Sequence, residues 1–314
     1  MANSDLKKFE VVGIDVGNGY TKTVNTEFIS AVKDYGETKP AITDNLLMYD
    51  GKYYIVGGER TKTKTDKKKD NTALILALAG LGYELNFRGI GDTSVILSEG
   101  LPLERCIKEK QIEDEEYYKQ GETLYFEYED VPHTVKIEKV LVNPQCVAGV
   151  IDLLADGMLP DPCIVVDLGS WTVDILPIED GKPQGSRIKS ALDGVINCML
   201  NCNDEIRRKT GEEVSEKQIQ KVMLGDKMAL PPEYAHICIK TTKEYVKGIA
   251  DTLAENKFNV NTISCVFMGG GASIVKKYGE EYFPITKYIT NIRANAIGFE
   301  KIGNQYLEKM KSGK

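Results

Sequence analysis

The sequence predicts an α/β fold made of two similar halves. A strand, an Asp-x-Gly turn and a second strand occur at residues 11–24 and again, in altered form, at residues 163–176. The first strand of each copy, 11–14 or 163–166, is short, rich in β-branched residues and bounded by turn residues, as buried strands are. The length of 314 residues fits about two domains of ~150 residues each. The repeat therefore indicates an internal duplication around a shared cleft.

The overall composition is that of a folded, acidic protein. Apolar residues make up 42% of the chain and charged residues 28%, a balance typical of globular domains. The formal charge is −7 and the sequence pI is near 5.2. Such a chain has no general basic field for nucleic acid, so direct DNA contact is not expected and a DNA role would go through a partner.

Neither end of the chain nor its interior predicts membrane insertion. Residues 1–8 lack the apolar core of a secretory signal, and no run approaches the ~20 apolar residues that cross a bilayer. We therefore expect a cytoplasmic protein without direct membrane contact. The seven cysteines are scattered and mostly lie in apolar segments, which favours free core cysteines in a reducing compartment. A metal site at Cys198 and Cys202 is the alternative, although the chain has only two histidines.

The first half is expected to be rich in strands. Residues 28–33, 45–49 and 52–57 have the composition of strands, and residues 58–72 contain no apolar side chain. The segment 58–72 is predicted to be an exposed loop. Its basic part, 60–69, is either simply solvated or a contact surface for an acidic partner or a neighbouring subunit.

A helix is expected to follow this loop, with Asn71 or Thr72 as its N-cap and apolar residues on one face. The pattern then predicts a strand at 92–99, a charged helix at 104–120 and a hairpin of strands 123–128 and 134–142. A helix at about 147–156 should end at Gly157 and Pro160.

The second half is expected to contain more helix. Helices are predicted at 194–209, at 215–225 with a Ser215 and Gln218 capping pair, and at about 232–257. A strand at 262–268 then leads into a glycine-rich segment, 269–272. A final helix at about 295–310 is expected to return and cover the first domain.

The two Asp-x-Gly turns have the residues needed to hold a phosphate chain. Glycine turns bring backbone N–H groups close to phosphate oxygens, and neighbouring hydroxyl and amide groups add donors. Lys22 is the only cation in either loop. Asp15 and Asp167 would repel phosphate unless a cation intervened, which predicts Mg²⁺ held mainly through water. Either turn alone is more often an ordinary turn, but the pair, followed by Gly269–Ala272, is more specific.

This combination resembles the actin, Hsp70 and sugar-kinase superfamily of ATPases. Its five sequence elements occur in order as a first phosphate loop, a first connecting segment, a second phosphate loop, an adenosine motif and a second connecting segment, at 13–22, 142–149, 165–172, 267–272 and 294–298. The resemblance implies an actin-like ATPase fold, with two ribonuclease-H-like domains facing each other across a nucleotide cleft. Domain I would span 1–162 with a variable subdomain at about 28–72, domain II would span 163–289, and 290–314 would return to domain I.

Within the superfamily the chain is most similar to bacterial actin-like proteins of the ParM plasmid-segregation type. Its length leaves no room for a peptide-binding domain, and Gln145 stands where sugar kinases offer an aspartate base. The resemblance implies a self-assembling, ATP-hydrolysing filament protein that segregates DNA through a DNA-binding adaptor. A small-molecule phosphotransferase and a nucleotide-gated scaffold without filaments are the two alternatives.

The resemblance also assigns roles to residues. Gln145 would position the attacking water, with Asp15 and Asp167 as further catalytic residues that hold Mg²⁺ through water; the alternative for Gln145 is a surface residue beside Pro144. Trp171 would either stack near the nucleotide or seal the edge of the cleft. ATP is expected as the nucleotide, and GTP is the alternative. The expected nucleotide contacts are Gly17, Asn18, Gly19, Tyr20, Thr21, Lys22, Gly169, Ser170, Trp171, Thr172, Gly269, Gly270, Gly271 and Ala272.

Overall fold

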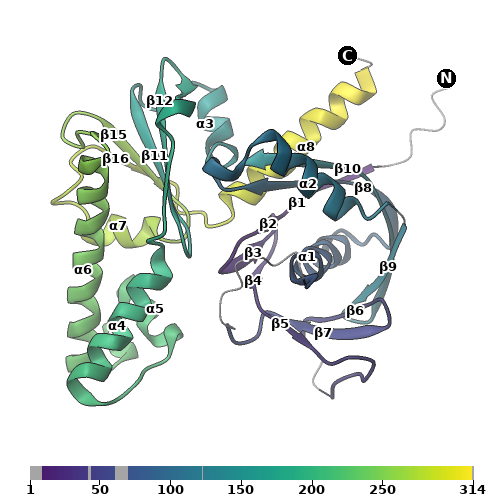
Figure 1. The fold of residues 1–314 in the computed structure, drawn as a ribbon, viewed down its shortest axis with the longest axis horizontal. Coiled ribbons are helices and arrows are strands. Elements are labelled where there is room, and N and C mark those ends of the chain that lie inside the picture. The colour runs from purple at the N-terminus through teal and green to yellow at the C-terminus, as the bar shows by residue number, and fades with distance from the viewer. Residues whose placement is uncertain (1–8, 42–43, 61–69, 122, 313–314) are drawn as a thin grey trace. The chain divides into compact units, whose positions relative to one another are not determined.

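The computed structural model describes residues 9–41, 44–60, 70–121 and 123–312. The chain divides into two compact units, here called unit 1 (residues 1–151 and 293–314) and unit 2 (residues 152–292) (Figure 1). The sequence-based boundaries, 162/163 and 289/290, differ from these because residues 152–162 and 290–292 belong to unit 2. The basic segment 61–69 lies outside the described residues.

Unit 1 contains a large mixed sheet and a small antiparallel one. The large sheet has the order β1-β8-β10-β9-β6-β7-β5, with β1, β8 and β10 parallel and its other pairs antiparallel. Its strands are β1 (Phe9–Gly13), β5 (Val32–Asp34), β6 (Leu46–Tyr49), β7 (Lys52–Val56), β8 (Asp92–Leu101), β9 (Thr123–Tyr128) and β10 (Val131–Pro144). The small sheet consists of β2 (Asp15–Val16), β3 (Tyr20–Lys22) and β4 (Glu27–Ile29).

The single strand expected at 28–33 is wrong, because the chain changes sheets there. Strand β4 ends at Ile29 and pairs with β3, whereas β5 begins at Val32 and pairs with β7. Between them, the backbone N–H of Ser30 donates to Gly19 O at 3.0 Å. A strand pattern alone does not reveal such a change of partner.

Helix α1 (Thr72–Arg88) lies among the strands of unit 1 (Figure 1). Nearly all of its first four turns are buried, which explains why its apolar residues extend beyond the single face expected. The expected N-cap is wrong: Asn71 has a left-handed backbone and its side chain makes no capping bond. Asp70 provides an acceptor instead, for the Thr72 N–H at 3.2 Å.

The other helices of unit 1 lie in the second half of its sequence. The charged helix α2 (Lys108–Lys119) begins later than expected, because Leu103–Arg105 forms a separate 3-10 turn. A 3-10 turn, Ala148–Val150, leads into α3 (Ile151–Ala155), whose residues from Asp152 onward belong to unit 2. The final helix α8 (Ala294–Ser312) packs on β1 and β8, as expected, and buries Phe299 completely.

Unit 2 is a sheet covered by long helices. The sheet order is β13-β12-β11-β15-β16, with β14 paired to β12. Ser215 and Gln218 form the expected capping box at the start of α5, and the apolar stripe of α6 is buried. Its elements are β11 (Cys163–Leu168), β12 (Val173–Glu179), β13 (Lys182–Pro183), β14 (Lys189–Ala191), α4 (Val195–Thr210), α5 (Glu216–Leu224), α6 (Pro232–Glu255), β15 (Ser264–Met268), α7 (Ala272–Tyr278) and β16 (Thr286–Tyr288), with 3-10 turns at Gly185–Arg187 and Lys227–Ala229.

The cysteines agree with the expectation of free thiols in the core. All seven cysteines are free thiols; six are buried and Cys106 is half-buried. Among the described residues, no helix is long and apolar enough to cross a bilayer.

His133 makes the stability of unit 1 depend on pH. Its ring is 2% exposed, stacks on Phe126 and places Nδ1 3.3 Å from Gly91 O, while Nε2 has no hydrogen-bond partner among the described residues. Burial lowers the pKa of His133. The unfolded chain therefore binds the proton more tightly, and the free energy of unfolding should fall as the pH drops below about 6.5.

We expect this loss to have a slope of at most about 1.4 kcal/mol per pH unit, ending below the folded-state pKa. The slope should be smaller in His133→Phe, which keeps an aromatic ring against Phe126. Urea unfolding at pH 7.5, 6.5 and 5.5 measures it. His236→Gln, at an exposed position of α6, is the control. Equal slopes in the wild type and His133→Phe would contradict the assignment.

Candidate functional site

In unit 1 the first phosphate loop is a tight hairpin with a buried carboxylate at its base. Strands β2 and β3 pair so that Asp15 lies opposite Lys22. Asp15 is 4% exposed, and Lys22 Nζ lies 3.7 Å from its Oδ2. Gln145 Nε2 donates to the other oxygen, Oδ1, at 2.8 Å. The structure therefore brings Gln145 to Asp15 of the hairpin, although the two residues are 130 positions apart in the sequence.

Local backbone geometry determines where Gln145 lies. Strand β10 ends at Pro144, and the Gln145 N–H donates to Leu101 O at the end of β8, at 2.9 Å. The next residue, Cys146, has a left-handed backbone with φ of 67°, which is unfavourable for a side chain other than glycine or asparagine. Its N–H donates to Asn295 Oδ1 at 2.9 Å, so helix α8 holds the segment in this conformation.

The remaining residues of the first loop differ in exposure. Asn18 is exposed at the tip of the hairpin and Tyr20 is half-buried. Thr21 is fully buried, and its hydroxyl lies 2.9 Å from that of Ser30. Side chains alternate along a strand, so Thr21 points to the opposite face from Lys22 and stabilises the hairpin from inside. Its hydroxyl is therefore not presented at the surface as the expected phosphate donor.

In unit 2 the second loop is tied to the start of a helix. Asp167, 6% exposed, is the last residue but one of β11 and lies opposite Asp174 on β12. The turn is closed by a bond from Gly169 N to Thr172 O at 2.9 Å. The carbonyl oxygens of Gly169, Ser170 and Trp171 accept bonds from Val195, Ile196 and Gly194 at the start of α4. These bonds fix the backbone of the second loop.

At one equivalent position the two copies of the loop carry side chains of opposite charge. Lys22 lies opposite Asp15 in the first copy, and Asp174 lies opposite Asp167 in the second. Asp174 is 3% exposed and accepts a bond from Thr172 Oγ1 at 3.1 Å and one from Ser190 Oγ. The first loop thus carries a positive charge where the second carries a hydrogen-bonded carboxylate.

The glycine segment 269–272 lies against the second loop. Strand β15 runs parallel to β11, with Met268 beside Asp167. Gly269 has φ of 80°, and a Cβ there would lie 2.3 Å from Asp167 Oδ1, so only glycine fits. Gly271 N donates to Leu168 O at 3.0 Å, whereas Gly270 is exposed with open space around it. Asp167, Gly169–Thr172 and Gly269–Ala272 therefore form one group in unit 2.

Comparison with known proteins agrees with this arrangement. Residues 13–147 match the family described as "Actin like proteins N terminal domain", and residues 165–280 match "Archaeal actin homologue MreB-like, C-terminal". The chain belongs to the actin-like proteins. The predicted resemblance and the two-domain actin-like fold are thereby confirmed. A comparison with curated protein sequences finds no significant match.

Solved structures show the same fold over almost the whole actin-like chain. An archaeal actin homologue in complex with ADP is 21% identical with a TM-score of 0.73, covering 94% of this chain and 99% of that one. ParM of Bacillus thuringiensis with ATP is 16% identical with a TM-score of 0.68, covering 95% and 98%. The Alp12 filament structure is 16% identical with a TM-score of 0.65, covering 95% and 99%.

Trp171 of this actin-like chain packs against the hydrophobic core of unit 2. Its Nε1 is buried and has no hydrogen-bond partner among the described residues. Both expected roles of Trp171, stacking near the nucleotide and sealing the edge of the cleft, stay predictions.

Several residues that shape the actin-like site were not expected from the sequence. Ser30 Oγ donates to Gly17 O at 2.6 Å, and Arg60 Nη1 donates to Gly19 O at 3.0 Å. Arg60 also lies over the Tyr20 ring, 5.4 Å from its centroid. These contacts join residues of no common motif, so no spacing rule could have found them.

Proposed function

We propose that this chain binds ATP, assembles into filaments and hydrolyses the bound nucleotide. The contact of Gln145 with Asp15, beside Lys22, is the observation that carries the proposal. The similar structures support it, since the archaeal actin homologue is described with ADP, the ParM protein with ATP and Alp12 as a filament. ATP is the proposed nucleotide and GTP the alternative.

The chemistry follows from how Asp15 holds Gln145. The Asp15 carboxylate accepts a hydrogen bond from Nε2 and so orients the Gln145 amide. The amide oxygen Oε1 of Gln145 then points away from Asp15 and can accept a hydrogen bond. An amide oxygen is too weak a base to take a proton, but it can align a water with the γ-phosphate. Phosphoryl transfer depends chiefly on such positioning and on charge stabilisation, so slow hydrolysis is expected. Lys22 would supply positive charge to the phosphates, and the loop N–H groups would supply donors.

Magnesium fits the oxygen donors of Asp15 and Asp167, but it would keep most of its water. The described residues contain no group of three or more His, Cys, Asp or Glu side chains that could form a metal site. Mg²⁺ retains several waters and needs only one or two carboxylates besides the substrate phosphates. When bound, it would neutralise charge on the phosphates. Asp15 and Asp167 are the residues proposed to hold it through water.

In the proposed function, the bound nucleotide is the substrate of hydrolysis and also controls filament assembly. A nucleotide that favours an assembly-competent state shifts the population of conformations, and hydrolysis reverses that shift. We propose plasmid DNA segregation in the cytoplasm as the cellular role. The net charge of −7 argues against direct DNA contact, so a DNA-binding adaptor would connect the filament to its cargo.

One experiment tests the proposal as a whole. Light scattering and phosphate release are followed together after Mg-ATP is added to the purified chain. Scattering that rises and then falls as phosphate appears is the expected result. Phosphate transfer only after a sugar or acid is added would identify a phosphotransferase instead, and binding without scattering would identify a scaffold.

Replacing Lys22 by methionine should weaken ATP binding by about 10- to 100-fold, because one charge-assisted contact of about 1.5–3 kcal/mol is lost. Titration with a fluorescent ATP analogue measures the dissociation constant. Lys139→Met is the matched control, since Lys139 forms an ion pair with Glu115 elsewhere in unit 1. Equal affinities of the two variants would contradict a phosphate-binding role for Lys22.

A further inference from the structure

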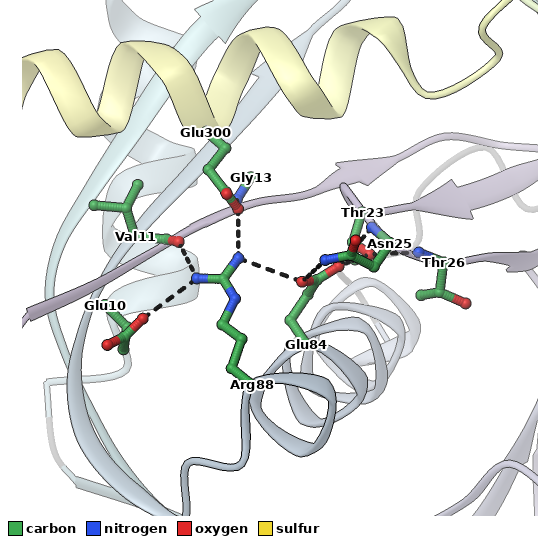
Figure 2. Close-up of polar contacts among 9 residues, drawn as sticks. All are labelled: Glu10, Val11, Gly13, Thr23, Asn25, Thr26, Glu84, Arg88 and Glu300. Carbon is green, nitrogen blue, oxygen red and sulfur yellow. Dashed lines mark hydrogen bonds and ion pairs between the residues drawn. The ribbon is translucent and has the colours of Figure 1, made fainter.

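A group of charged residues lies behind the first phosphate loop, and the site described above does not include it. Its centre is the Arg88 guanidinium, in the last turn of α1 (Figure 2). Nη2 lies 2.7 Å from Glu300 Oε2 and 3.3 Å from Glu84 Oε2. Nη1 donates to Val11 O at 2.7 Å and to Glu10 Oε2 at 3.4 Å. One cation therefore joins β1, α1 and α8.

The group is well shielded from water. The side chain of Glu84 is 0% exposed, and those of Arg88 and Glu300 are 20% and 19% exposed. Burying a carboxylate is costly unless donors surround it. Glu84 meets this condition through Thr23 and Asn25 as well as Arg88. Burial raises the pKa of Glu300, and Arg88 opposes that rise.

These carboxylates hold both ends of the first phosphate loop. At the start of the loop, Gly13 N donates to Glu300 Oε2 at 3.3 Å. Just beyond its end, Thr23 Oγ1 donates to Glu84 Oε1, Asn25 N donates to the same atom at 2.8 Å, and Asn25 Nδ2 donates to Oε2 at 2.8 Å. Figure 2 shows the carboxylates of Glu84 and Glu300 both joined to Nη2 of Arg88. The residues between these two ends include Asp15 and Lys22.

We propose that Glu84, Arg88 and Glu300 form a positioning cluster that holds the first phosphate loop in its nucleotide-binding conformation. The cluster acts through the backbone of Gly13 and through Thr23 and Asn25, to which its carboxylates are hydrogen-bonded. This inference rests on the proposed nucleotide-binding function. It predicts that nucleotide affinity depends on side chains beneath the loop. Glu10 contacts Arg88 but has no hydrogen bond to either end of the loop among the described residues, so it provides a matched control.

The test compares the full-length wild type with Arg88→Met, Thr23→Val and Glu10→Gln. Fluorescent ATP analogue titrations give the dissociation constants, and urea unfolding gives global stability. Arg88→Met and Thr23→Val should weaken binding by about tenfold, because displaced binding groups lose much of their effect. Glu10→Gln should stay within about twofold, since the ends of the loop remain held. Thr23→Ser keeps the hydroxyl and should retain the wild-type affinity for the ATP analogue. Its unfolding midpoint in urea should be similar to that of Thr23→Val, so that the two variants differ in affinity and not in stability.

Hydrogen exchange without nucleotide supplies an independent measurement. Amides of residues 14–25 should exchange faster in Arg88→Met and Thr23→Val, while those of β11 in unit 2 stay unchanged. If Arg88→Met does not fold, Thr23→Val decides, because it leaves every Arg88 contact in place. Unchanged exchange at 14–25, or equal ATP affinities of Thr23→Val and Thr23→Ser, would overturn the positioning role. If the wild type binds no nucleotide, the proposed function is wrong. The hydrogen-exchange measurement then tests by itself whether the cluster holds the loop.

Discussion

Replacing Gln145 by alanine is expected to lower the rate of ATP hydrolysis by about 100-fold, the usual effect of losing a group that assists proton transfer or positions the nucleophile. The affinity for ATP should change by less than about threefold, because the proposed role of Gln145 concerns the attacking water rather than the bound phosphates. Single-turnover phosphate release and ATP analogue binding measure the two quantities separately. Filaments of the variant should persist after assembly, since hydrolysis is the step that would loosen them.

Gln184→Ala is the matched control for this experiment. Its amide donates to the carbonyl oxygens of Glu179 and Lys182, within a turn of unit 2. It should hydrolyse ATP at the wild-type rate. If Gln145→Ala also does so, the proposed role of Gln145 in hydrolysis is wrong. If both binding and hydrolysis collapse, the contact with Asp15 supports the loop instead of catalysis.

Gly298→Ala should destabilise unit 1 by about 3–4 kcal/mol, in the upper range for single substitutions. A Cβ on Gly298 would lie 1.9 Å from Ala148 O, so α8 and the turn Ala148–Val150 would have to separate. The same turn follows Cys146, whose left-handed backbone depends on Asn295 of α8. Urea unfolding followed by circular dichroism measures the loss, and a lower yield of soluble protein should accompany it.

Gly248→Ala is the matched control, since it makes the same change within a helix, α6. Apart from the backbone of its own helix, no atom of the described residues lies within 4 Å of a Cβ at Gly248, so the alanine should stabilise the helix by about 0.5–1 kcal/mol. Opposite signs for the two variants are the expected result. A Gly298→Ala protein as stable as the wild type would show that α8 can move away from the turn without cost.

The fold was predictable where a local rule decides the structure. The capping pair of Ser215 and Gln218 and the buried stripe of α6 follow from short spacings, and both are confirmed. The expected cap of α1 at Asn71 or Thr72 was wrong, because Asn71 took a left-handed turn and Asp70 supplied the acceptor. The strand at 28–33 was wrong because its two halves pair in different sheets, which local composition does not encode.

The candidate site was predictable as motifs but not as contacts. Glycine and aspartate in a strand-turn-strand pattern reveal a phosphate-type loop wherever it occurs. The bond from Gln145 to Asp15 joins residues 130 positions apart, and they meet because β1 and β10 both pair in parallel with β8. Arg88 and Glu84 lie in the helix expected after the basic loop. From the sequence alone, their spacing predicts an ordinary (i, i+4) ion pair on the surface of a helix. Their burial beneath the phosphate loop depends on the tertiary fold. The catalytic and binding roles of the site residues stay predictions.

The discontinuity of unit 1 has a consequence for the order in which the protein forms on the ribosome. Unit 2 is one continuous stretch, 152–292, whereas unit 1 needs α8, which is translated after all of unit 2. Until then the side of β1 and β8 that buries Phe299 and Leu307 stays uncovered. Domains usually fold in the order of their synthesis. Here the second unit can complete its core first, and the first must wait for the final helix.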